Sequence, residues 1–362
     1  MRIAKATRKY ESWLSRYTGI VEADLKLKHS QMAAGVFPFL RATFYRWMQL
    51  WPEVCEELTS TQRILSVGDL HVENFGTWRD IEGRLIWGIN DFDEVYPLPF
   101  TLDLVRLATS ARLAIAAQHL GIDPDKACDA VLKGYRDGLE AGGRPMVLAE
   151  EHGWLREMAL GELRDPVLFW RKMDRSTIRT SVPKGARKAL ESLMPEPGVP
   201  SRMAHRIAGL GSLGRQRFVA LANWRGARLA REAKALVPSA CVWAGSGKGD
   251  RGILYQIVLD RAVRCRDPFV HLRGRWIVRR LAPDCSRIEL ESLPRKRDEY
   301  KLLQAMGWET ANVHLATRTR IPAVLLDLKK RGKGWLRRTS EAMMHATLAD
   351  WKDWRKGAVA PE

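Results

Sequence analysis

The sequence lacks the features that mark several large classes of protein. No run approaches the eighteen or so apolar residues of a membrane-spanning helix, and the basic N-terminal residues lead into no apolar segment of a secretion signal. The 5 cysteines are odd in number and widely spaced, without a C-x-x-C pair, which argues against both a disulfide framework and a zinc site. We therefore expect a reduced, cytoplasmic protein without a membrane span.

Positive charge is what the sequence has in excess. Its 362 residues carry a formal net charge of +18, and a 46% hydrophobic content can support a core in one large domain or two ordinary ones. Such a field attracts polyanions, whether nucleotides, RNA, acidic lipid or acidic protein. The basic run LKKRGKGWLRR (328–338) is typical of a solvated face, although it could also hold RNA or another anionic surface.

Two acidic patches lie close together in the first third of the chain. GDLHVENFG (68–76) is followed by INDFDE (89–94), and the residues between them read as two strands around a turn at Glu82-Gly83. That turn would place Asn74 opposite Asp91, with Cβ atoms about 4.5–5.5 Å apart. Amide and carboxylate oxygens suit Mg²⁺, so the two patches are predicted to form one site. A slip of one residue in the register would undo this pairing.

Several other elements are predicted by local pattern. The first 60 residues look helical, with a break near Pro38, and histidines in apolar helices such as His119 and His314 are expected to be packing residues. GSGKGD (245–250) lacks the spacing of a Walker loop and is interpreted as a hairpin tip. We expect strands at 61–67 and 274–283, and helices at 100–120, 124–140, through 146–205, at 253–266 and at 296–318.

The acidic patches resemble the catalytic segment of the aminoglycoside phosphotransferase branch of protein-kinase-like enzymes. The pattern H-G-D-x-H-x-x-N followed by I-D-F-D matches GDLHVEN and NDFDE from Gly68 onward, although Val67 stands in place of the first His. The combination of FPFLRA, GDLHVENFG, INDFDEV, LDLVRLATSA and GLGSLGRQRF resembles more closely the uncharacterised bacterial family called domain of unknown function 2252.

This resemblance implies roles for the matching residues. Asp69 would be the base that orients or deprotonates the acceptor hydroxyl, and His71 would support its loop. Asn74 and Asp91 would hold Mg²⁺ at the phosphates of ATP, and Asp93 could be a further ligand or a cap. The Asp at position 103 would tie the following helix to the catalytic loop, and Arg41 is expected to pair with a carboxylate near that loop.

A kinase-like site also needs a phosphate-covering loop and a lysine, which are found after the acidic patches. GLGSLG has G-x-G-x-x-G spacing, so its backbone N–H groups could approach phosphate closely. Lys234 follows as the candidate phosphate-pairing lysine. The segment around it, ARLAREAKAL, reads as a helix as readily as a strand. The glutamate that usually pairs with such a lysine is not evident, and neither Asp260 nor Gln256 is a convincing substitute. The candidate nucleotide-binding residues are Gly209, Gly211, Ser212, Gly214 and Lys234.

The implied fold is α+β, a two-lobed protein-kinase-like fold whose lobes are circularly permuted. Residues 1–205 would form a largely helical catalytic lobe with the metal-site hairpin, and 206–292 a small β-rich nucleotide-binding lobe. Residues 293–362 would form the helical return and the basic tail.

Three functions compete at this point. The first is an ATP- and Mg²⁺-dependent phosphotransferase, with AMP transfer or nucleotide binding alone as variants. The second is a metal-dependent hydrolase that uses Asp69, His71, Glu73, Asp91 and Asp93 and needs no ATP. The third is a nucleic-acid-binding protein driven by net charge, with strongly salt-dependent affinity. The first interpretation explains the most residues and is preferred. The sequence identifies neither the acceptor nor the oligomeric state, although the basic surface hints at an anionic acceptor.

Overall fold

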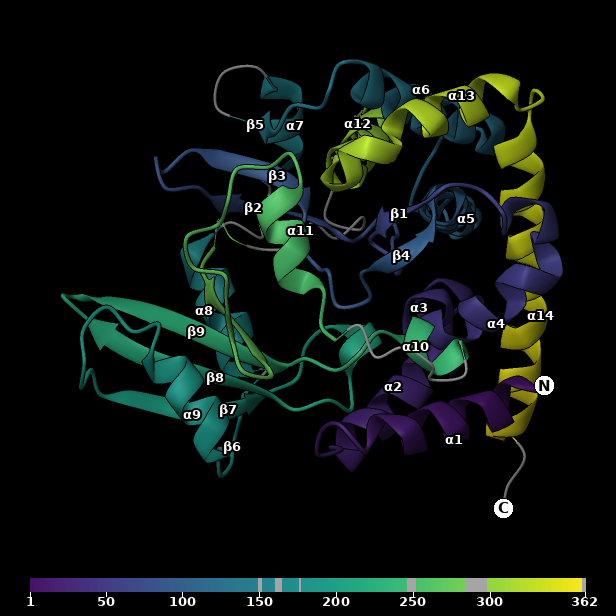
Figure 1. The fold of residues 1–362 in the computed structure, drawn as a ribbon. Helices are drawn as coiled ribbons and strands as arrows, with labels where there is room; N and C mark the ends of the chain where they lie inside the picture. The colour runs from purple at the N-terminus through teal and green to yellow at the C-terminus, as the bar shows by residue number, and fades with distance from the viewer. Residues whose placement is uncertain are drawn as a thin grey trace.

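The computed structural model describes residues 1–148, 152–159, 165–175, 177–245, 252–283, 285 and 298–359. It is a mixed α+β fold, as expected, with the helices and sheets arranged as in Figure 1. The hairpin tip expected at 245–250 lies almost wholly outside the described residues. No helix in the described part of the chain combines the length and the apolar character that crossing a membrane requires.

The N-terminal region is helical, as predicted. It forms α1 (Ile3–Leu14), α2 (Glu22–Ala34), α3 (Val36–Ala42), α4 (Phe44–Val54) and the short η1 (Glu56–Leu58). The break expected near Pro38 lies instead at Gly35, between α2 and α3. Pro38 is accommodated in the first turn of α3, where a backbone N–H has no partner within the helix.

A second group of helices forms the large core. It consists of α5 (Phe100–Ala116), α6 (Pro124–Glu140), α12 (Glu299–His314), α13 (Ile321–Lys330) and α14 (Trp335–Val359), with η5 (Leu315–Arg320) joining α12 to α13. The apolar α5 is buried over almost its whole length. The long α14 packs along α5, α4 and α1, so the basic C-terminal region covers the core with one face (Figure 1).

A six-stranded antiparallel sheet forms the part of the molecule opposite α14 (Figure 1). Its strand order is β10-β11-β9-β8-β7-β6. The strands are β6 (Thr177–Arg179), β7 (Ser201–Arg206), β8 (Arg217–Trp224), β9 (Ala227–Ala235), β10 (His271–Arg273) and β11 (Trp276–Leu281). Helix α9 (Lys184–Glu191) covers one face, and α8 (Pro166–Arg175) packs on part of the other.

The sheet corrects one expectation and decides between the two interpretations left open for the segment around Lys234. Residues 146–205 contain not only helices, namely α7 (Gly153–Ala159), α8 and α9, but also β6, β7 and the short β5 (Met146–Val147). The ambiguous segment around Lys234 is the strand β9, because it pairs with β8 on one side and β11 on the other. Two further short helices, α10 (Ala240–Ala244) and α11 (Tyr255–Arg261), follow β9.

The predicted hairpin exists, but its predicted register is wrong by one residue. Strands β2 (Phe75–Arg79) and β3 (Leu85–Ile89) pair so that Asn74 lies opposite Asn90 rather than Asp91. The connection is longer than expected because the Asp80 carboxylate organises it, accepting hydrogen bonds from the backbone N–H groups of Glu82 (3.1 Å) and Arg84 (2.9 Å). Two further strands, β1 (Arg63–Ser66) and β4 (Tyr96–Pro99), pair beside this hairpin at the start of α5.

Helices α6 and α12 cross so closely that we expect a methyl group at the crossing to destabilise the protein. A Cβ at Gly134 would overlap the carbonyl oxygen of Gln304 on α12. The obstructing atoms all belong to the backbone of Gln304, so Gly134→Ala should lower the free energy of unfolding by about 3 kcal/mol in urea titrations. The control is Gly357→Ala in the last turn of α14, where an added Cβ meets nothing within 4 Å. Equal stability of the two variants would contradict this packing.

Candidate functional site

The loop that carries the first acidic patch runs from β1 to β2 and is fixed to the core by Asp103. This carboxylate, at the start of α5, accepts hydrogen bonds from the backbone N–H groups of Val67 (2.7 Å) and Gly68 (2.9 Å). Gly68 has a φ of +83°, and a Cβ there would lie 2.5 Å from the carbonyl oxygen of Glu94. Asp103 thus ties α5 to the loop, as the resemblance implied.

A buried polar chain extends from this attachment point. His314 on α12 lies with Nε2 2.9 Å from Oδ2 of Asp103 and Nδ1 2.8 Å from the hydroxyl of Tyr135 on α6. All three side chains are fully buried. His314 is therefore more than the packing residue expected from its apolar helix, because it connects three helices to the catalytic-loop candidate.

Asp69 is oriented by an arginine that the sequence analysis did not identify. Arg106, fully buried on α5, donates from Nε to Oδ1 of Asp69 (3.0 Å) and from Nη2 to the carbonyl of Leu40 (2.9 Å). Its guanidinium also lies over the rings of Phe44 and Trp47. Burial raises the pKa of Asp69, although the charge of Arg106 opposes this shift. An arginine inside the largely apolar segment TLDLVRLA was the available signal.

Asn74 and Asp91 face the same cavity although they are not cross-strand partners. The Asn74 side chain donates to the backbone carbonyl of Asp69 (2.5 Å), which fixes it to the loop. Asp91 follows the end of β3, and its side chain is 42% exposed, so its carboxylate is open to a ligand. Burial would raise the pKa of Asp91, but the charges of Lys234 and Arg279 outweigh it and hold that pKa below the usual range.

Lys234 is brought to the acidic patch by β9. Its Nζ lies 3.2 Å from Asp91 Oδ1 and 2.7 Å from Asp93 Oδ1, and its side chain is 3% exposed. Asp93 in turn pairs with Arg215 (3.2 Å). Burial, together with the neighbouring charge of Asp91, raises the pKa of Asp93. The acidic partners of the lysine are thus the two aspartates of the site, while Gln256 and Asp260 bond to each other.

The glycine-rich loop closes over these residues. It includes the short helix η3 (Leu210–Ser212), and Gly209 and Gly214 have φ values of +75° and +93°. A Cβ at Gly211 would lie 2.9 Å from the carbonyl of Arg41 and 3.6 Å from Asp69 Oδ2. Only a residue without a side chain allows so close an approach to the backbone of Arg41. Ser212 Oγ donates to the carbonyl of Gly209 (3.1 Å).

The remaining predicted residues support the loop. His71 is 5% exposed, and its Nδ1 accepts a hydrogen bond from the backbone N–H of Glu73 (3.2 Å). The Glu73 carboxylate is paired with Arg41 at 2.6 Å, as predicted for that arginine. Neighbouring Glu94 pairs with Arg215 (3.1 Å) and accepts from the backbone N–H of Ala240 (2.6 Å).

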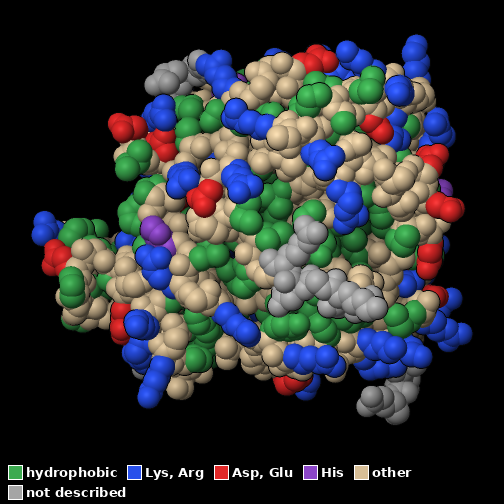
Figure 2. Space-filling view, viewed as in Figure 1, with side chains coloured by type: hydrophobic (Ala, Val, Ile, Leu, Met, Phe, Trp, Pro, Cys, Tyr) green, Lys and Arg blue, Asp and Glu red, His purple; other side chains and the backbone are tan. Residues whose placement is uncertain are grey.

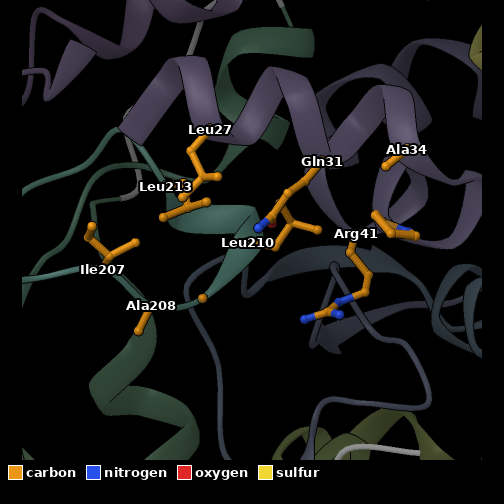
Figure 3. Close-up of a pocket in the computed structure, with 10 residues that line it drawn as sticks. Leu27, Gln31, Ala34, Arg41, Ile207, Ala208, Leu210 and Leu213 are labelled. Atoms are coloured by element: carbon orange, nitrogen blue, oxygen red, sulfur yellow. The ribbon is translucent and has the colours of Figure 1, made fainter. Parts of the chain in front are cut away.

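Three cavities adjoin at this place. A small one of about 60 Å³ lies between the two acidic patches and the glycine-rich loop, and both Asp69 and Asp91 line it. A larger one of about 840 Å³ lies against the six-stranded sheet and shares Asn74, Asp91 and Gly209 with the small cavity. Figure 3 shows the third, of about 320 Å³, between α2, α3 and the outer side of the glycine-rich loop.

The residues present suit a metal ion only in the company of a ligand. Among the described residues, no three His, Cys, Asp or Glu side chains are grouped as a metal site. Asn74 and Asp91 can supply two oxygens, and phosphate and water would have to supply the others, which is the usual coordination of Mg²⁺ in phosphoryl-transfer enzymes.

The comparisons with known proteins cover only part of this arrangement. Residues 20–158 match the model of a family described as an uncharacterised protein conserved in bacteria (DUF2252). The match includes both acidic patches and α5 but not the glycine-rich loop or the six-stranded sheet. Searches of curated proteins and of solved structures gave no match.

Proposed function

We propose that this protein is an ATP- and Mg²⁺-dependent phosphotransferase with a circularly permuted, protein-kinase-like arrangement. The observation that carries the proposal is the contact between Lys234 and Asp91 at the cavity that Asp69 also lines. Kinases of this kind combine a glycine-rich loop, a lysine on the third strand of the small lobe, a metal-binding Asp and Asn, and an Asp that accepts the hydroxyl proton. In this chain β7, the loop, β8 and β9 follow in that order after the short β6, with Lys234 on the last of these strands.

The proposed reaction assigns one role to each residue. ATP would occupy the large cavity with its phosphates toward the glycine-rich loop and Lys234. Asn74 and Asp91 would hold Mg²⁺, which neutralises charge on the phosphate oxygens. Asp69, oriented by Arg106, would accept the proton of the acceptor hydroxyl while the hydroxyl oxygen bonds to the γ-phosphorus of ATP. The bond from that phosphorus to the β-phosphate oxygen breaks, and ADP leaves.

The other two interpretations have weaker support. A metal-dependent hydrolase would need more protein ligands than the described residues group together. A nucleic-acid-binding protein would be favoured by one strongly basic surface, but Figure 2 shows Lys and Arg side chains spread over the visible face among other types. Neither alternative gives a role to the contact between Lys234 and the aspartates.

Calorimetric titration with a non-hydrolysable ATP analogue tests the proposal. We expect the wild-type protein to bind one equivalent when Mg²⁺ is present and at least tenfold more weakly when EDTA removes it, because the metal neutralises repulsion between the phosphates and Asp91. Absence of binding by protein that circular dichroism shows to be folded would overturn the proposal.

A further inference from the structure

The large cavity carries far more positive charge than one kinase-type lysine would supply. Nine Lys and Arg side chains line it, against two Asp side chains. Several of the basic residues belong to β7, β8 and β11, which lie with β9 in the six-stranded sheet.

Three of these arginines converge on a single carboxylate. Glu232 on β9 is fully buried, and its Oε1 accepts hydrogen bonds from Arg217 Nη1 and Arg279 Nε, both at 2.9 Å. Arg206 donates to its other oxygen. These charges hold the pKa of Glu232 well below its usual range against the effect of burial, so the group of four bears a net charge of about +2. The side chains of Arg206 and Arg279 are 18% and 26% exposed, so part of this excess charge is open to a bound anion.

A fourth arginine lines the same cavity. Arg264 lies between the rings of Trp78 (4.7 Å) and Phe92 (4.8 Å). Its Nε and Nη1 have no hydrogen-bond partner among the described residues. Its positive charge adds to that of the other basic side chains that line the cavity.

The arginine group is also connected to the glycine-rich loop. Arg217, which donates to Glu232, donates from Nη2 to Ser212 Oγ (2.6 Å). Arg217 therefore links the arginine group directly to the loop that is proposed to cover the phosphates.

We propose that Arg206, Arg217 and Arg279, with Arg264 lining the same cavity, form an anion subsite for a ligand group that bears several adjacent negative charges, such as a polyphosphate. This inference deepens the proposed function. The part that the subsite would play in phosphoryl transfer rests on that proposed function, whereas anion binding by the arginines does not. The group can belong either to the phosphate tail of the nucleotide or to an anionic acceptor. Guanidinium groups bind phosphate oxygens through strong, charge-assisted hydrogen bonds.

Titration with inorganic tripolyphosphate in EDTA tests the subsite without Mg²⁺. Wild type should bind it, and Arg279→Gln should bind about tenfold more weakly through loss of one charge-assisted contact. Glu232 keeps two arginine partners in this variant, so the fold should be retained, which thermal unfolding checks. The matched control is Arg225→Gln, which removes the same charge from an exposed position in the β8–β9 turn and should leave affinity unchanged.

Two further arms separate the outcomes. Competition between tripolyphosphate and the Mg²⁺-bound ATP analogue would assign the subsite to the nucleotide tail, and simultaneous binding would assign it to an anionic acceptor. No binding of tripolyphosphate to folded wild type, or equal affinity in Arg279→Gln and Arg225→Gln, would overturn the inference. Asp91→Ala should keep tripolyphosphate binding in EDTA, because that binding needs no metal. Failure of the phosphotransferase proposal would instead appear as loss of Mg²⁺-dependent binding of the ATP analogue by wild type.

Discussion

Replacing Asp69 with Asn should slow Mg²⁺-dependent ADP production by about 10²–10⁴-fold, the usual contribution of a general base. Asparagine keeps an oxygen for Arg106 but cannot accept the hydroxyl proton. Affinity for the ATP analogue should change little, because the phosphates lie toward Asp91 and Lys234 in the proposed complex. The readout is the rate of ADP release at saturating ATP.

The pH dependence gives this prediction a second readout. The base is active as the carboxylate, and burial raises the pKa of Asp69. Wild-type turnover should therefore fall as the pH decreases through that raised pKa, whereas the residual turnover of Asp69→Asn should not follow the same curve. Asp80→Asn is the matched control, since Asp80 is likewise a carboxylate paired with an arginine but lies in the hairpin turn. Equal loss of turnover in the two variants would contradict the role of Asp69.

Replacing Asp103 with Ala should lower the free energy of unfolding by about 4 kcal/mol. The variant leaves the N–H groups of Val67 and Gly68 and Nε2 of His314 without their acceptor, and each buried unsatisfied donor costs about 1–3 kcal/mol. The measurement is the shift of the urea midpoint at constant slope. Such a loss is a large part of the stability of a typical domain.

Two companion variants make the result interpretable. Asp103→Asn keeps one acceptor oxygen and should lose less stability, which preserves the test if the alanine variant does not fold. Asp137→Ala removes a carboxylate from an exposed i,i+4 pair with Lys133 and should cost less than about 1 kcal/mol. A similar cost for Asp103→Ala and Asp137→Ala would show that the buried chain through His314 contributes little.

Local sequence pattern predicted those helices and strands whose own residues favour the structure that they adopt. The largely apolar segment that forms α5 and the amphipathic segment that forms α6 favour helices, and α6 begins with the capping residue Asp123 followed by proline. The hairpin was predicted, but its register was not, because the Asp80 side chain rather than the Glu82-Gly83 pair organises the turn. A side chain that bonds to backbone in this way extends the loop without changing the hydrophobic alternation.

Long-range pairing is what the sequence could not reveal. The segment around Lys234 is rich in helix-forming residues, yet it is a strand because β8 and β11 supply its hydrogen bonds. Arg106 and Asp69 are 37 residues apart, and Arg279 and Glu232 are 47 apart, so no local period links either pair. The acidic patches carried enough chemistry to predict a site, whereas the arginine group became visible only when the sheet placed its strands together.

Calorimetric titration of Asp91→Ala with the ATP analogue and Mg²⁺ tests the central claim most directly. The matched control is Glu82→Ala, which removes one negative charge from the exposed turn of the same hairpin. We predict that wild type and Glu82→Ala bind the analogue in a Mg²⁺-dependent manner, and that folded Asp91→Ala loses this dependence. Mg²⁺-dependent binding that is unchanged in Asp91→Ala would place the nucleotide elsewhere and contradict the account.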